Sequence, residues 1–290
     1  MARIQIEEND DPIDIRYDHV FKAVFTRNTP SSKGALSKLV SAFIGREVSI
    51  ITINANEPPI ENLQDRRLRF DINCRTKNGE LVNVEMSLNP ATFEPVRLEF
   101  HVGKLFTGQD IHGIEKSYSD LKQAFQITIL ANGKFFADET FFHTFKYYDR
   151  KNNVSLEGRS RIITVELSKL GKVIKKQTQE MNVQEYWAVY FEYLTDRSKR
   201  WKINEILEQE EGIAMASEEL LTISKDEEER ARLLSELKYE LDMQSLRVEA
   251  KREGRREGRQ EGRQEGRQEI VELLKSGKTT EEIVRDYGNE

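Results

Sequence analysis

Residues 69–87, RFDINCRTKNGELVNVEMS, are the most informative stretch of this chain. Alternating apolar and polar residues on both sides of Asn78-Gly79 predict a β-hairpin. A two-residue turn would place apolar side chains of one strand beside polar side chains of the other. A three-residue loop, residues 77–79, with Gly79 in the left-handed conformation, brings the apolar faces together. The pattern therefore selects the three-residue loop and its register.

This register places two carboxylates opposite each other. Ile72 pairs with Val84 on the apolar face, so Asp71 lies directly across from Glu85 on the polar face. Their Cβ atoms would be about 5 Å apart. Like charges at that distance repel each other unless a positive group lies between them.

Two explanations for this pair remain open from the residues alone. In the first, the polar face is solvated, and Arg69, Arg75 or a lysine from a helix neutralises the carboxylates. In the second, Asp71 and Glu85 bind a divalent cation. Hard oxygen ligands suit Mg²⁺, with Mn²⁺ as an alternative, and such an ion binds phosphate oxygens and activates a water molecule.

The composition of the chain excludes several classes of protein. It has 290 residues, with 45 Lys and Arg against 51 Asp and Glu, and a net charge of −6. No run approaches the roughly 18 apolar residues of a spanning helix, and the first residues carry no apolar signal segment. We therefore expect a soluble cytoplasmic protein without a membrane partner. Cys74 is the only cysteine, which excludes an internal disulfide framework.

The charge is unevenly distributed and suggests three regions. Residues 1–202 carry 30 basic and 27 acidic side chains, whereas residues 203–290 carry 15 and 24. The acidity of the chain therefore does not exclude a nucleic-acid substrate for the first region. We predict a main domain over residues 1–202, a charged helical segment over 203–252, and a repeat followed by a short helical hairpin over 253–290.

The periodicity of the main domain predicts a mixture of helices and strands. The predicted helices are 17–25, 31–44, 93–110 and 183–194, and the predicted strands are 48–53, 68–76, 81–88, 124–130, 141–148 and 161–167. This order indicates an α/β fold with a mixed central sheet flanked by helices. The C-terminal tail is predicted to be mostly α-helical.

The tail contains EGRREGRQEGRQEGRQE, a four-residue repeat over residues 253–269. Like charges recur at i,i+4, and each glycine costs about 0.8–1 kcal/mol relative to alanine in a helix. By itself the repeat would be a marginal helix or a disordered linker, and it has no apolar seam for a coiled coil. The acidic helical hairpin after it favours protein contacts, so we expect the tail to support a homo-oligomer.

Asp71 followed by Glu85-Met86-Ser87 resembles the D…(D/E)-x-K signature of the PD-(D/E)XK nucleases. More specifically, the chain is similar over about residues 15–195 to the bacterial recombination-promoting nuclease (Rpn-like) transposases of that superfamily. The other landmarks that carry this resemblance are residues 18–25 (DHVFKAVF), the run Arg97, Gln109, Gly113 and Tyr118, residues 163–169 (ITVELSK), and Trp187.

The resemblance implies a restriction-endonuclease-like fold and a Mg²⁺-dependent DNA endonuclease that acts in recombination. Asp71 and Glu85 would bind the metal, and Arg97 and Gln109 would contact the DNA. One position departs from the family pattern. Ser87 stands where the superfamily has lysine and this branch usually has glutamine.

A serine hydroxyl hydrogen-bonds a water molecule but supplies no positive charge. Arg69, across from Ser87 in the predicted register, and Lys22, on the first predicted helix, are candidates to replace that charge. Asp18 is a candidate third carboxylate, although an aspartate that opens a helix also serves as a cap. Two other functions stay open: a catalytically impaired relative that binds nucleic acid or protein, and a helical interaction adaptor.

Overall fold

The computed structural model describes residues 4–54, 71–111 and 115–287. The chain divides into two compact units, Met1–Leu233 and Leu234–Glu290. The α-helices of the first unit are α1 (Asp18–Thr26), α2 (Pro30–Ile44), α3 (Glu94–Thr107), α4 (Val183–Tyr193), α5 (Arg200–Gln209) and α6 (Glu211–Lys225). Its strands are β1 (Ile50–Ile53), β2 (Ile72–Thr76), β3 (Leu81–Ser87), β4 (Ala124–Leu130), β5 (Phe142–Phe145), β6 (Tyr148–Asp149), β7 (Val154–Ser155) and β8 (Ser160–Glu166). Five 3₁₀ turns connect them: Tyr118–Asp120, Leu167–Lys169, Val173–Lys175, Thr178–Glu180 and Arg197–Lys199.

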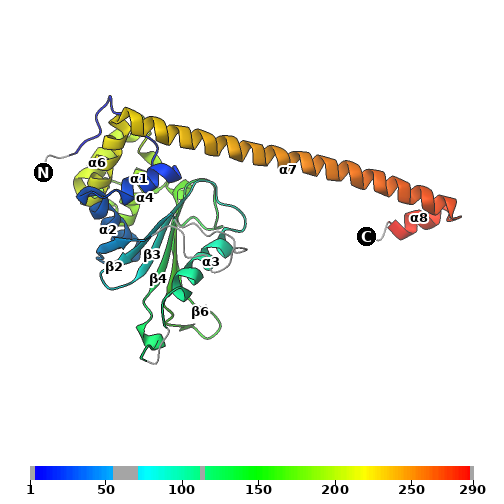
Figure 1. Ribbon diagram of the computed structural model, residues 1–290, viewed down its shortest axis with the longest axis horizontal. Coiled ribbons are helices and arrows are strands. Elements are labelled where there is room, and N and C mark those ends of the chain that lie inside the picture. The colour runs from blue at the N-terminus through cyan, green and yellow to red at the C-terminus, as the bar shows by residue number, and fades with distance from the viewer. Residues whose placement is uncertain (1–3, 55–70, 112–114, 288–290) are drawn as a thin grey trace. The chain divides into compact units, whose positions relative to one another are not determined.

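A mixed six-stranded sheet forms the centre of this unit, in the order β1-β2-β3-β4-β8-β5 (Figure 1). The pairs β3-β4 and β4-β8 are parallel, while β1, β2 and β5 pair antiparallel to their neighbours. The predicted α/β fold with a mixed sheet and flanking helices is confirmed. The strand predicted over 141–148 is interrupted, since β5 ends at Phe145 and the chain leaves the sheet to form the small hairpin β6-β7.

The β2-β3 hairpin has the predicted register. Ile72 pairs with Val84, and Gly79 closes the loop at φ +84°. The amide of Thr76 donates to the Glu80 carbonyl at 3.0 Å, and the amide of Gly79 donates to the Thr76 carbonyl at 2.8 Å. Arg69, which the sequence places across from Ser87, lies outside the described residues.

The two faces of the sheet differ in chemistry. One face packs with α1, α2 and α4 into the main apolar core, which includes Phe25 and Trp187, both fully buried. Helix α3 covers the other face and packs against β3, β4 and β8 (Figure 1). Beneath α3 the sheet carries buried polar residues, namely Asn83, Glu85, Gln126, Thr128 and Thr164. This face holds the candidate functional residues.

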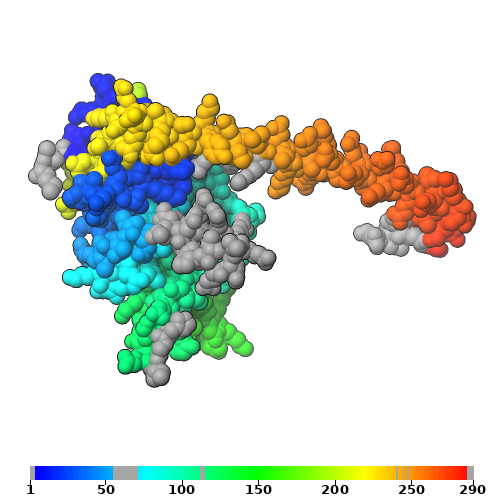
Figure 2. Space-filling model, in the orientation of Figure 1, coloured from blue at the N-terminus to red at the C-terminus, as the bar shows by residue number. Residues whose placement is uncertain are grey.

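Helices α5 and α6 belong to the first unit. Ile203 of α5 and Ile213 and Leu220 of α6 are buried in the main core, and α6 packs along α2 and α1. Figure 2 shows the yellow α6 against the blue N-terminal helices. This unit therefore extends past the change in charge composition at residue 202.

The second unit consists of most of α7 (Glu227–Lys275) followed by α8 (Thr280–Tyr287). The repeat over residues 253–269 lies within α7. Of the two alternatives, a helix and a disordered linker, the structure therefore has the helix. Gly277, at φ +94°, ends the turn between the helices, and Thr279 and Glu282 form a reciprocal cap at the start of α8. No helix in the described parts of the chain is long and apolar enough to cross a membrane.

Gly79→Ala should destabilise the first unit, because a side chain at φ +84° costs about 1–2 kcal/mol. The added Cβ would also lie 3.3 Å from the Lys122 side chain. Urea unfolding followed by circular dichroism measures the loss. Gly171→Ala is the matched control, since it meets no atom within 4 Å and has no positive φ. Equal stability of the two variants would contradict the loop geometry.

Candidate active site

Charged side chains from three elements meet at the β2-β3 hairpin. Helix α1 supplies Asp18 and Lys22, which are one turn apart. Asp71 immediately precedes β2, and Glu85 lies within β3. Lys22 forms ion pairs with both Asp18 and Asp71, and the charges of Asp18 and Glu85 act on Asp71, so the structure brings together four of the side chains that the sequence singles out.

Asp71 is held at the edge of this cluster. Lys22 Nζ lies 3.1 Å from its Oδ1, and the backbone amide of Met86 donates to its Oδ2 at 3.2 Å. Burial raises the pKa of Asp71 to about 8, together with the charges of Asp18 and Glu85, and Lys22 opposes this rise. The ionised form of Asp71 thus lacks sufficient positive charge around it.

Lys22 bridges two carboxylates. Its Nζ lies 2.7 Å from Asp18 Oδ2, in addition to its contact with Asp71. Burial lowers the pKa of Lys22, but the charges of Asp71 and Asp18 outweigh that effect and the net change is upward. Lys22 therefore remains a cation at neutral pH. Asp18 Oδ1 is buried without a hydrogen-bond partner among the described residues.

Glu85 has a different environment from Asp71. Arg97 pairs with its Oε1, while His101 Nδ1 lies 3.3 Å and Gln126 Nε2 lies 2.9 Å from its Oε2. Burial raises the pKa of Glu85, but His101 and Arg97 outweigh it and the net change is downward. Glu85 is therefore ionised and held in a fixed orientation, whereas the charge of Asp71 is not fully compensated.

The family model for PD-(D/E)XK nuclease family transposases matches residues 15–250. The chain belongs to this family. No curated protein and no solved structure matches the chain. The match includes the hairpin and α3, and it supports the resemblance drawn from Asp71, Glu85 and the landmarks around them.

Three side chains that contact Glu85 or Arg97 are not predicted from the sequence as part of this site, namely Glu94, His101 and Gln126. Glu94 and Arg97 form an ion pair on α3, and His101 lies one turn further along the same face. Their spacing of three and four residues was a usable signal for a shared face. Gln126 is the one amide in the strand AFQITIL, and its Oε1 accepts from Asn83 Nδ2 at 2.9 Å.

The remaining predicted residues lie in different places. Ser87 is the last residue of β3, half-buried, two positions after Glu85. Arg97 contacts Glu85 itself, so it is part of the carboxylate cluster. Gln109 lies beyond α3, where its side chain donates to the Lys122 carbonyl at 3.0 Å and accepts from the Lys122 amide at 2.8 Å. It thus holds the connection from α3 to β4 near the start of that strand, away from Glu85.

The carboxylates of the nuclease family member fit a divalent cation. Asp71 and Glu85 offer hard oxygen ligands, and the unpartnered Asp18 Oδ1 adds a third oxygen nearby. Burial raises the pKa of Asp71, and the charges of Asp18 and Glu85 add to this rise, so a bound cation would favour the ionised carboxylate. Among the described residues, no group of three or more His, Cys, Asp or Glu side chains is already arranged around one metal position.

Without divalent cations, Asp71 should make the folded state less stable as the pH rises. Its folded pKa of about 8 exceeds the usual 3.8, so the folded state binds more protons between these values and stability falls across that window. Asp71→Asn removes this dependence. Urea unfolding in EDTA at pH 5 and pH 8 should show a smaller stability difference for the variant than for the wild type.

Added Mg²⁺ gives a second readout. It should raise the stability of the wild type at pH 8, because a ligand of the folded state stabilises it by mass action, and it should have less effect on Asp71→Asn. Asp138→Asn serves as the control, since that carboxylate is exposed and pairs with His143 outside this cluster. A Mg²⁺ effect of the same size in all three proteins would contradict a site at Asp71.

Proposed function

We propose that this protein is a Mg²⁺-dependent DNA endonuclease in which Asp71 and Glu85 bind the metal ion, with Mn²⁺ as an alternative. The observation that carries the proposal is the pair of carboxylates on one hairpin, with Glu85 buried, Asp71 only 13% exposed and the Lys22 ammonium 3.1 Å from Asp71. Family membership supports a nuclease-like or transposase-like activity. We further propose that its cleavage of DNA promotes recombination.

The chain's own residues have distinct roles in this reaction. A bound divalent cation would lower the pKa of a water molecule and offset the charge of the phosphodiester. Water adds its oxygen to phosphorus and gives up a proton to the surrounding solvent, one P–O ester bond breaks, and the departing oxygen takes up a proton from the solvent. Lys22 supplies the positive charge beside Asp71 that Ser87 lacks, and Asp18 holds the Lys22 ammonium in place.

Glu85 is oriented by residues on two elements. Arg97 and His101 from α3 and Gln126 from β4 contact its two oxygens, which fixes the carboxylate before any ligand arrives. Such preorganisation is the protein's main contribution where catalysis depends on positioning and charge.

A second candidate function rests on specific observations at the same site. Ser87 carries no charge, and Arg97 already neutralises Glu85. Both features suit a catalytically impaired relative that binds nucleic acid or protein. That candidate predicts DNA binding without metal-dependent cleavage, which separates it from the endonuclease. The helical adaptor has no comparable support, since the hairpin carboxylates would have no role in it.

Asp71→Ala and Glu85→Ala should each reduce nicking of supercoiled plasmid in Mg²⁺ or Mn²⁺ by about 100-fold or more, because each removes a proposed metal ligand. Gel assays of open-circular and linear products measure the rate and would also detect joined products of strand transfer. Glu139→Ala is the control, since Glu139 is exposed and pairs only with Lys134 among the described residues. No cleavage by any form would favour the impaired relative.

Lys22→Ala should lower the nicking rate by about 100-fold, in the range of a general acid or base, if Lys22 replaces the family's third catalytic residue. Lys22→Arg retains the charge and should retain part of the activity. Arg69→Ala tests the other candidate in the same assay. Full activity of both alanine variants would exclude a charge replacement by either residue.

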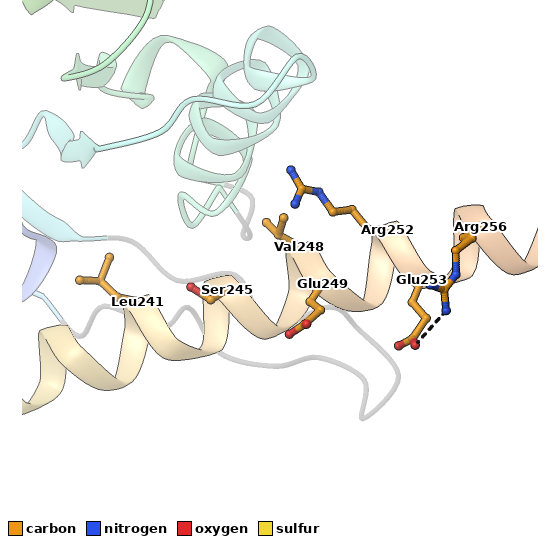
Figure 3. Close-up of a pocket in the computed structure, with 7 residues that line it drawn as sticks. All are labelled: Leu241, Ser245, Val248, Glu249, Arg252, Glu253 and Arg256. Atoms are coloured by element: carbon orange, nitrogen blue, oxygen red, sulfur yellow. Dashed lines mark ion pairs between the residues drawn. The ribbon is translucent and has the colours of Figure 1, made fainter.

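We also propose that α7 pairs with the α7 of a second copy of this chain. Leu234, Leu241 and Val248 recur every seven residues, and each is at least 42% exposed. Figure 3 shows Leu241 and Val248 on one side of α7 and the Glu253–Arg256 ion pair further along the helix, within the repeat. An apolar residue at every seventh position supplies one of the two apolar positions of a heptad, and this seam precedes the repeat, which has none.

Leu241→Glu with Val248→Glu should convert a dimer of the full chain to a monomer, because two charges would enter the apolar seam. Size-exclusion chromatography with light scattering gives the mass. Tyr239→Glu adds a charge on the opposite side of α7 and should leave the dimer intact. A monomeric wild type at all concentrations tested would refute the pairing.

A further inference from the structure

An apolar groove lies on the same sheet face as Glu85, on the other side of α3. Its volume is about 240 Å³, and its walls include Leu98 and Val102 of α3, Ile162 of β8, and Phe145 and Tyr147 at the end of β5. Phe145 is 40% and Tyr147 52% exposed, so two aromatic side chains are accessible at the groove. Its lining is mostly apolar, with Lys146 and Glu99 as its charged members.

A buried ion pair fixes one wall of this groove. Glu166 and Lys169 form an ion pair in which neither side chain is exposed. Glu166 Oε1 also accepts from the Phe136 amide at 3.3 Å, and Lys169 Nζ lies 5.8 Å from the centre of the Phe136 ring. Phe136 in turn packs on Phe145, with ring centroids 5.2 Å apart. The wall is therefore a preformed aromatic surface.

The hairpin beside the groove carries free positive charge. Lys146, Arg150 and Lys151 are exposed, and in the described ranges of the chain none of their side chains forms an ion pair or hydrogen bond. The Asp149 carboxylate between them accepts from the amides of Lys151 and Asn152 and so caps the turn. Residues 145–161 contain five Lys and Arg against two Asp and Glu. An anionic partner fits this surface.

The groove and the carboxylate cluster are close enough for one strand of nucleic acid. Phe145 pairs with Ile162, Ile162 with Gln126, and Gln126 with Asn83, so all four share the face that bears Glu85. From β3 to β5 there are three strand spacings, or about 14 Å. One strand of a stacked duplex rises about 3.4 Å per nucleotide, so a strand that stays stacked spans this distance with about four nucleotides and a more extended strand spans it with fewer.

We propose that this groove binds an unpaired nucleobase of the same strand whose phosphodiester lies at Asp71 and Glu85, which makes single-stranded or locally opened DNA the preferred substrate. The inference rests on the proposed nuclease function. A base has an apolar face that stacks on aromatic side chains and tolerates any sequence. Its flanking phosphates meet Lys146, Arg150 and Lys151 on the hairpin.

Fluorescence anisotropy with a labelled 20-nucleotide thymidine strand tests this binding, with the full chain in EDTA so that no cleavage occurs. Tyr147→Leu and Phe145→Leu keep the groove apolar but remove an aromatic ring. Each should weaken binding by about fivefold or more, as expected for loss of base stacking. Tyr239→Leu is the matched control, because Tyr239 is an exposed tyrosine on α7.

A strand of the same length with abasic residues separates base contacts from phosphate contacts. The wild type should bind it more weakly than the thymidine strand, and Tyr147→Leu should lose little further affinity. Replacing Lys146, Arg150 and Lys151 by alanine should reduce the slope of log Kd against log salt concentration by about 2, since each phosphate contact to a single strand contributes about 0.7 to that slope.

Equal binding of both strands by the wild type and the Tyr147 and Phe145 variants would overturn the base site, and an acidic peptide groove would give that same result. Plasmid nicking distinguishes this failure from failure of the proposed function. If Asp71-dependent nicking persists while the variants bind normally, only the groove assignment is wrong. If the wild type neither binds nor nicks DNA, both proposals fail.

Discussion

The site is organised around the repulsion between two carboxylates that one hairpin register holds on the same face. Asp71 and Glu85 meet this constraint in different ways. Glu85 is surrounded by Arg97, His101 and Gln126, which favour its ionised form. Asp71 has Lys22 beside it, but burial and the charges of Asp18 and Glu85 raise its pKa to about 8. The unequal compensation leaves one position in the cluster where an added positive charge would be stabilising.

The sheet tolerates this arrangement because it separates apolar and polar chemistry between its faces. Phe21 and Phe25 of α1 and Trp187 of α4 pack on the apolar face. They are fully buried in a core that also includes residues of α6. The opposite face can therefore bury charged groups, because most of the apolar area that drives folding lies elsewhere. Helix α3 covers that face and supplies Arg97 and His101, which contact Glu85.

Much of this site could be predicted from local sequence. The hairpin register follows from alternation and a loop glycine, and these two features alone place Asp71 opposite Glu85. Lys22 could be named as a replacement cation because it lies on an adjacent predicted helix. Gln126 could not be placed in the same way. Its contact with Glu85 depends on the parallel pairing of β3 and β4, which are separated by α3 and a long connection, so no local pattern specifies it.

The boundary predicted at residue 202 also rests on a local property of the sequence, its charge composition. Charge composition describes the surface, whereas the extent of a folded unit depends on which apolar side chains reach the core. Ile206 and Ile213 reach it although their helices are rich in charge. Helix α3 shows the same principle within the site. Arg97 and His101 face the carboxylates, while Leu98 and Val102, one residue further on, line the neighbouring groove. One helix therefore sets the position of both surfaces, and any shift of α3 along the sheet would move them together.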